Sequence, residues 1–154
     1  MKPSIFLRIA SVLTLLHAVL HTIGGVFGKA PDGVAAATDA IMRANRFEIM
    51  GVNRTYWEFL RGMGLGVTIS LTAEGLVFWL LGSLAKKYAL ELRPICWVFA
   101  LAYLAFALNS YFYFFAAPVI VEILIAACFL GAIVTAKPAA SQESMPLRMH
   151  AAGD

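Results

Sequence analysis

The sequence predicts an all-α fold, an integral membrane bundle of four transmembrane helices. Of its 154 residues, 61% are hydrophobic and 14% are charged, whereas soluble domains are about half apolar and about a quarter charged. The mean hydropathy is +0.80, and the apolar residues form long blocks, as they do in membrane-spanning segments. The chain length fits one domain, which we expect to comprise residues 1–137.

The first two spans are expected at about residues 5–27 and 56–84. The first contains Arg8 and two histidines as its only titratable side chains. Lys2 and Arg8 also resemble the basic start of a signal peptide, but the apolar stretch is long for one, and the nearest small-residue cleavage site is followed by Pro31. We therefore expect the first span to be retained.

The third and fourth spans have to share one apolar block. Residues 95–136 contain one acidic residue, Glu122, and no basic residue. As a single helix, this block would be about 63 Å long, roughly twice the thickness of the bilayer core. Pro118 marks the expected break, because proline is tolerated in the first turn of a helix and costly in its interior. The two spans are therefore expected at about residues 95–116 and 118–136, joined as a hairpin.

The segments outside the spans indicate the topology. Residues 28–55 form a long first loop, in which residues 34–50 could be a short interfacial helix. Residues 138–154 form a small, polar tail that should be disordered. The N-terminus, the second loop and the tail carry seven Lys and Arg residues, and the first loop carries four. Because Lys and Arg favour the cytoplasmic side, both termini should be cytoplasmic and the first loop should lie outside.

The charge pattern also limits the partners. The net charge of +3 comes mostly from residues outside the apolar blocks, so it indicates topology, and we expect the lipid bilayer as a partner and no nucleic acid. The two cysteines form no CxxC motif and suggest no disulfide framework.

Polar side chains from different spans are expected at one depth, in the outer half of the bundle. They are His17, His21, Glu58, Arg61, Asn109 and Glu122. At 1.5 Å per residue, His17 and His21 lie about 18 and 24 Å from the cytoplasmic start of the first span. Ionisable groups inside a membrane usually face the bundle interior and often mark function. Glu74, nearer the inside, is a second intramembrane carboxylate that should be protonated, paired or hydrated.

Helical spacing predicts which faces of the spans meet. In the first span, a small and polar stripe is formed by Ala10, Thr14, His17, His21, Gly24 and Gly28, and the opposite, lipid-facing stripe by Val12, Leu16, Leu20, Ile23 and Phe27. Similar small and polar stripes are Gly62, Gly66, Ser70 and Glu74 in the second span, and Ala102, Ala105 and Asn109 in the third. Because small residues let helix backbones approach closely in membranes, these stripes are expected at helix contacts.

The polar residues also have structural interpretations. Thr55 and Glu58 fit a capping box, Arg61 could pair with Glu58 or reach the headgroups, and Asn109 could join two helices. The histidine pair could hold a metal ion with Glu122 or Glu58 as third ligand. We expect no metal site, because only two histidines lie in the spans; the imidazoles should instead hydrogen-bond to Glu122, Asn109 or Glu58 and touch a polar ligand head.

Two motifs carry a family resemblance. NRTYWEFLRGMGLG (residues 53–66) and LHTIGG (residues 20–25) form a pattern that resembles a family of small, uncharacterised bacterial four-helix membrane proteins, similar in layout to DoxX-like proteins. The resemblance covers these motifs and the four-span layout. It implies a multi-pass protein of the bacterial cell (inner) membrane and implies no activity or cofactor.

Two classes of function follow from the sequence. The favoured one is a non-enzymatic bundle that binds a small amphipathic ligand or serves as an accessory protein, as a homo-oligomer or with a partner membrane subunit. The alternative is a membrane enzyme acting on a lipid or quinone-like substrate, with His17, His21 and a carboxylate as acid–base groups or metal ligands.

Overall fold

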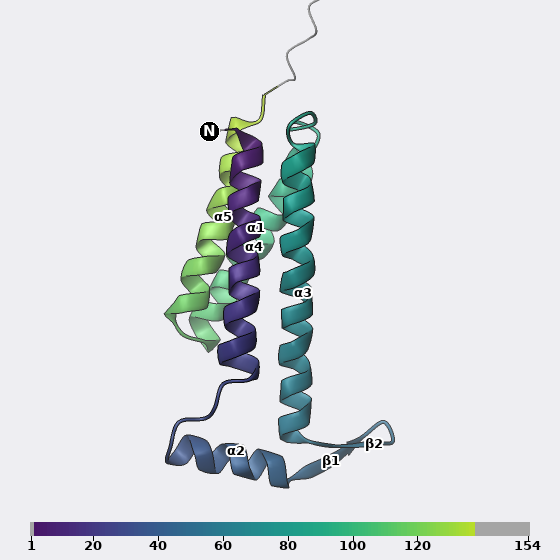
Figure 1. Ribbon diagram of the computed structural model, residues 1–154, viewed down its shortest axis with the longest axis vertical. Helices are drawn as coiled ribbons and strands as arrows, with labels where there is room; N and C mark the ends of the chain where they lie inside the picture. Colours follow the sequence, from purple (N-terminus) through teal and green to yellow (C-terminus); the bar gives the residue numbers. More distant parts are fainter. Residues whose placement is uncertain (1, 138–154) are drawn as a thin grey trace, which may run out of the picture.

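The computed structural model describes residues 2–137, so the predicted disordered tail lies outside the described residues. Its elements are α1 (Pro3–Leu20), the π-helical segment η1 (His21–Val26), α2 (Val34–Ala44), β1 (Arg46–Ile49), β2 (Val52–Thr55), α3 (Tyr56–Leu84), α4 (Arg93–Tyr113) and α5 (Ala116–Thr135). In Figure 1, α1, α3, α4 and α5 run along the long axis, and α2 with the β1–β2 hairpin lies across one end. The predicted all-α class is confirmed.

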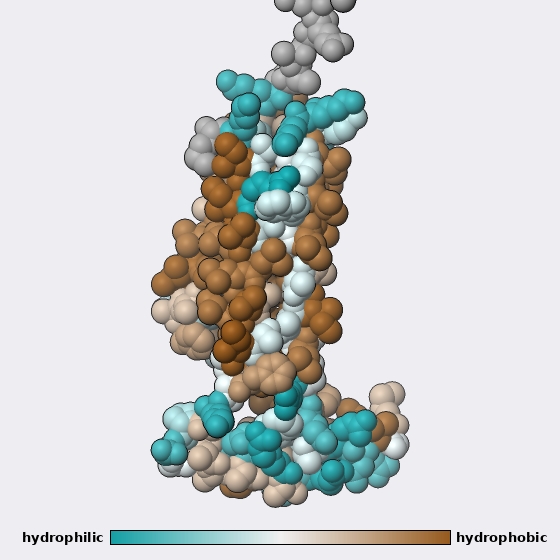
Figure 2. Space-filling view, in the orientation of Figure 1, coloured by the Kyte–Doolittle hydropathy of each residue, from teal (hydrophilic) through white to brown (hydrophobic). Residues whose placement is uncertain are grey.

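Four helical segments are long and apolar enough to cross a membrane. They are Pro3–Val26, Tyr56–Leu84, Arg93–Tyr113 and Ala116–Thr135. Figure 2 shows a broad hydrophobic band on the visible face of these helices, between hydrophilic surfaces at the α2 end and at the opposite end. Pro118 is the third residue of α5, where its missing N–H removes no intrahelical hydrogen bond.

The first loop departs from the single interfacial helix that its sequence suggested. The helix α2 ends at Ala44, because the backbone of Asn45 is extended and its side-chain amide donates to the Ile41 carbonyl at 2.8 Å. The chain then forms an antiparallel hairpin in which Ile49 pairs with Val52. Its two turn residues, Met50 and Gly51, have φ values of 51° and 78°, as a type I′ turn requires.

The core lies between the four long helices, and α1 and α5 are at its centre. The helix α1 packs against both α3 and α5, and α4 packs against α5. Aromatic side chains extend this core from α3 to the hairpin of α4 and α5. The ring of Phe78 lies edge-on to those of Phe99 and Phe129, with ring centroids 4.7 Å apart in each case. Phe78 and Phe129 are fully buried, so this cluster fixes the distance of α3 from α4.

The faces predicted for the first span are confirmed, except at the two glycines that follow α1. Ala10 and Thr14 are fully buried, and His17 and His21 are half-buried. The opposite residues are exposed: Val12, Leu16, Leu20, Ile23 and Phe27. Gly24 and Gly28 are exposed as well, because the chain leaves the bundle through η1 at this point.

The faces predicted for α3 and α4 are wrong, except at Glu74, whose carboxylate contacts Tyr103 on α4. A side chain added at Gly62 or Gly66 would meet no atom within 4 Å, and Ala105 and Asn109 are exposed. The faces that meet other helices are Gly64, Thr68, Leu71, Gly75, Phe78 and Gly82 in α3, and Cys96, Ala100, Tyr103, Ala107 and Ser110 in α4. Both follow spacings of four and three. Gly62 and Gly66 each stand two residues from Gly64, which is about 200° around the helix.

Gly75 and Gly131 are the glycines that a close helix contact requires. A Cβ at Gly75 would lie 2.7 Å from Cγ of Leu15, and a Cβ at Gly131 would lie 2.7 Å from Cε1 of Phe6. These two positions bring α3 and α5 against opposite sides of α1. The buried hydroxyl of Ser11 uses the first contact to donate to the Gly75 carbonyl at 2.6 Å.

Candidate functional site

The six polar side chains predicted at one depth do not form one hydrogen-bonded cluster. Within residues 2–137, no hydrogen bond or ion pair joins any two of them, so the bonds expected from the histidines to Glu122, Asn109 or Glu58 are not formed. His21, Glu58 and Glu122 instead bond to the neighbouring backbone or to a hydroxyl on an adjacent helix. Two polar regions result, one at the α2 end and one inside the bundle.

His21 contacts the backbone of α3. Its Nε2 lies 3.1 Å from the carbonyl oxygen of Gly64, which is hydrogen-bonding distance. A Cβ at Gly64 would lie 3.1 Å from Cγ2 of Val26 and 3.9 Å from His21 Nε2, so η1 packs closely against α3 at this glycine. His21 therefore ties the start of η1 to α3.

Glu58 caps a helix. The backbone N–H of Thr55 donates to Glu58 Oε2 at 2.8 Å, and the backbone N–H of Glu58 donates to Thr55 Oγ1 at 3.0 Å. Both halves of the capping box are therefore formed. Glu58 satisfies backbone donors at the start of α3 and points its carboxylate at its own helix end.

Arg61 has aromatic neighbours and forms no ion pair within residues 2–137. Its guanidinium carbon lies 4.5 Å from the ring centroid of Phe27 and 4.7 Å from that of Trp57. On the same indole, the guanidinium carbon of Arg43 lies 3.8 Å from the centroid. Arg43 is paired with Asp39 at 2.6 Å, whereas Arg61 makes no hydrogen bond or ion pair within the described part of the chain.

These residues border a cavity of about 330 Å³ that we call the α2 pocket. It lies between η1, the segment that follows it, α2 and the first turns of α3. Its lining is Val26, Phe27, Gly28, Lys29, Ala30, Ala36, Asp39, Arg43, Trp57 and Arg61. Three cations and one carboxylate make the pocket electropositive. The Arg61 guanidinium can offer paired N–H donors to a planar anion, and the aromatic rings offer an apolar wall beside it.

The interior polar region is centred on Tyr103, which the sequence analysis missed. Its buried hydroxyl donates to Glu74 Oε2 at 2.6 Å and lies 3.5 Å from Thr14 Oγ1. The Thr14 hydroxyl donates to the carbonyl of Ala10 at 2.9 Å. Glu74 is therefore a paired carboxylate, and Tyr103 links three helices. Tyr103 lies on one face with Ser110, seven residues away, and this spacing is the signal that could have found it.

Two buried polar atoms near this region lack a partner among the described side chains. Glu122 accepts a 3.0 Å hydrogen bond from the Ser110 hydroxyl on Oε1, whereas its Oε2 has none. Nδ1 of His17 is likewise buried without a partner. A buried polar atom left unpaired costs about 1–3 kcal/mol, so these atoms are places where water, a proton or a ligand would be stabilised.

Asn109 and the metal alternative find no support in the geometry. Asn109 is exposed on α4, and its side chain makes no hydrogen bond within residues 2–137. In the same part of the chain, no three His, Cys, Asp or Glu side chains lie close enough together to hold a metal ion. His17 and His21 therefore do not form a three-ligand site with Glu122 or Glu58.

No protein-family model, curated protein or solved structure matches this chain. Its resemblance to a family of small bacterial four-helix membrane proteins, DoxX-like in layout, stays a prediction.

Proposed function

We propose that this chain is a multi-pass membrane protein that binds a small amphipathic anion in the α2 pocket. The four long apolar helices span the membrane, which we take to be the inner membrane of a bacterial cell, with both termini in the cytoplasm. The α2 pocket then opens at the outer surface. Four spans of sufficient length and hydropathy and the distribution of Lys and Arg support this arrangement.

The observation that carries the proposal is the placement of the Arg61 guanidinium. It faces two aromatic rings in a cavity and has no acidic partner within the described residues. A guanidinium stays charged and can bind a carboxylate or phosphate through two parallel hydrogen bonds. A ligand with such a group would satisfy these donors.

The rest of the pocket indicates what lies next to the anionic group. Phe27, Trp57 and Val26 give it apolar and aromatic walls, and Lys29 gives it a further positive charge. The volume of about 330 Å³ is within the usual range for small-molecule sites. These features fit a short hydrocarbon or an aromatic group that carries a phosphate or a carboxylate.

Binding of octyl phosphate would test the proposal, with octanol as the uncharged comparison. Trp57 borders the pocket, so its fluorescence should change on titration with octyl phosphate and not with octanol at equal concentration. Arg61→Gln should weaken octyl phosphate binding about tenfold or more, because it removes a charge-assisted hydrogen bond.

Arg54→Gln is the matched control. Arg54 is an exposed arginine of the hairpin, and its one side-chain hydrogen bond within the described residues goes to the neighbouring Asn53 carbonyl. This variant removes the same charge from the same end of the protein and should bind octyl phosphate as the unaltered protein does. Equal loss in both variants, or equal binding of octanol, would contradict the proposal.

A second candidate function rests on the bundle interior. Acid–base chemistry on a lipid or quinone-like substrate would use the two unpaired buried atoms, Nδ1 of His17 and Oε2 of Glu122. Solvent extraction of the purified protein separates the candidates. A stoichiometric quinone or lipid that is lost in Glu122→Gln and kept in Arg61→Gln would favour the enzyme.

A further inference from the structure

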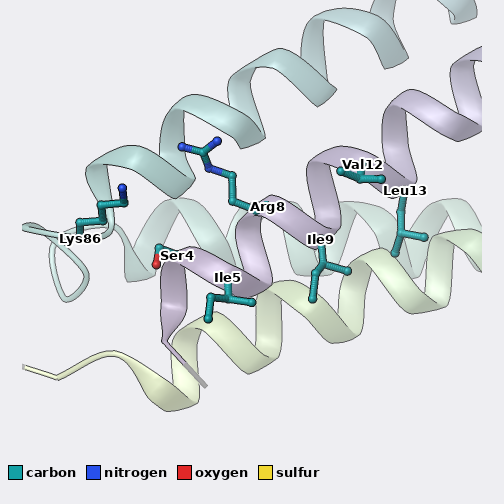
Figure 3. A pocket seen from close by; sticks show the side chains of 7 residues that line it. All are labelled: Ser4, Ile5, Arg8, Ile9, Val12, Leu13 and Lys86. Carbon is teal, nitrogen blue, oxygen red and sulfur yellow. The ribbon is translucent and has the colours of Figure 1, made fainter.

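A second cavity lies at the other end of the bundle, on the outer face of α1. It has a volume of about 590 Å³ and is bordered by Ser4, Ile5, Arg8, Ile9, Val12, Leu13 and Lys86. Figure 3 shows Arg8 extending toward α3 and Lys86 beyond the end of that helix, whereas Ile5, Ile9 and Leu13 extend from α1 on the side toward α5. We call this cavity the α1 groove. It has a basic edge and an apolar floor.

Arg8 is held in place by contacts with α3. Its Nη2 donates to Ser83 Oγ at 2.9 Å, and its guanidinium carbon lies 3.6 Å from the ring centroid of Trp79. The side chain reaches α3 because Gly82 has none, and a Cβ there would lie 3.1 Å from Arg8 Nε. An arginine fixed by stacking and one hydrogen bond keeps N–H donors available for an anion.

Lys86 supplies a second positive charge on the same edge. It follows the last turn of α3, is exposed, and makes no side-chain hydrogen bond or ion pair within the described residues. Glu91 is the one carboxylate in residues 82–95, and it forms no ion pair with either cation. The two cations on this edge are therefore not neutralised by the described residues of the chain.

The apolar floor runs away from the charged edge along α1. Ile9 and Val12 are exposed, and Val12 lies four residues, or about 6 Å, beyond Arg8 toward the middle of the bundle. A free phosphate ion would leave this floor unused. A phospholipid would use both parts. Its phosphate would lie at the charged edge, and its acyl chain would extend along the apolar floor toward the middle of the bundle.

We propose that the α1 groove binds one anionic phospholipid, with its phosphate between Arg8 and Lys86 and an acyl chain along Ile9 and Val12. The proposal presupposes the membrane insertion proposed above, and it is independent of ligand binding in the α2 pocket. With the N-terminus in the cytoplasm, the groove faces the inner leaflet. Basic pockets between helices on that side are known to favour anionic headgroups.

Native mass spectrometry of the purified full chain would test this inference. The protein in detergent is titrated with dioleoyl phosphatidylglycerol or with dioleoyl phosphatidylcholine, which has the same acyl chains and no net charge. One phosphatidylglycerol should bind several-fold more tightly than phosphatidylcholine. Lys86→Gln should reduce phosphatidylglycerol affinity about fivefold, the effect of one basic residue at a membrane surface.

Lys87→Gln is the matched charge control. Lys87 is the next residue, does not border the groove and lies near the ring of Tyr88, so its loss should change the affinity less than twofold. Ile9→Trp fills the floor and leaves both cations in place; it should weaken binding of phosphatidylglycerol. These variants spare the Arg8 contacts with α3, so the result does not depend on a variant that disturbs the fold.

Four results would overturn the inference: equal affinity for the two lipids, equal losses in Lys86→Gln and Lys87→Gln, unchanged binding in Ile9→Trp, or displacement of the lipid by excess inorganic phosphate. The last result would identify a site for free phosphate. Octyl phosphate binding at the α2 pocket should be the same in Lys86→Gln and the unaltered protein, so failure of either proposal can be recognised separately.

Discussion

At the scale of single residues, the buried hydroxyl groups matter most, because they pair polar atoms inside an apolar bundle. Tyr103 is the clearest case, with a hydroxyl that donates to Glu74 and a ring packed in the aromatic core. Ser110 does the same for Glu122. In each pair a hydroxyl on α4 meets a carboxylate on another helix, so a single oxygen atom determines whether that carboxylate has a partner.

Tyr103→Phe should therefore lower the free energy of unfolding by about 1–3 kcal/mol, because it keeps the ring and leaves Glu74 without its donor. Chemical unfolding in detergent would measure the change. Tyr111→Phe is the matched control, since Tyr111 lies on the same helix, is 70% exposed and makes no hydrogen bond within residues 2–137. Similar effects from both substitutions would show that the Tyr103–Glu74 bond contributes nothing to stability.

The candidate site could be predicted only in part, for reasons that belong to individual residues. Arg61 and Glu74 were identified because charges inside apolar spans are rare. The partner of Glu74 was missed because the Tyr103 hydroxyl is inconspicuous in an aromatic-rich helix. The contact of Arg43 with Trp57 depends on how α2 folds back over α3, which no local pattern specifies.

At the scale of elements, glycine determines how closely the long helices approach α1. The GxxxG motif at Gly62 and Gly66 suggested one contact face, but the face used is set by the alternating spacing of four and three through Gly75. The faces of α1 were predicted correctly because its apolar and polar stripes differ strongly. In α3 and α4 nearly every residue is apolar or small, so periodicity could not select the face. The hairpin was missed because its strands are short and lie beside a helical segment.

Gly75→Leu should destabilise the bundle much more than Gly66→Leu. At Gly75 a side chain meets Leu15, whereas at Gly66 it meets open space, and overpacking a close contact typically costs about 1–3 kcal/mol. Thermal unfolding of the two variants in detergent would measure the difference. If Gly66→Leu were the more damaging variant, then α3 would have to face α1 through the other side of the helix, or a second copy of the chain would have to cover Gly66.

At the scale of the whole molecule, the four long helices separate two basic cavities. The α2 pocket lies at the end that α2 crosses, and the α1 groove lies at the opposite end, beside the first turns of α1. Between them, the visible surface is a hydrophobic band (Figure 2). If the helices cross a bilayer, one cavity faces each side of the membrane, and a water-soluble anion and a membrane lipid would reach the protein from different directions.

Reporter fusions test this transmembrane arrangement most directly. Alkaline phosphatase, which is active only outside the cytoplasm, and green fluorescent protein, which is fluorescent only inside, are fused in turn near Asp39, after Lys87 and at the C-terminus. The account predicts an active phosphatase only near Asp39 and fluorescence only at the other two positions. Fluorescence at all three positions would contradict membrane crossing, and fluorescence near Asp39 with phosphatase activity at the other two would place the α2 pocket in the cytoplasm, contrary to the proposal.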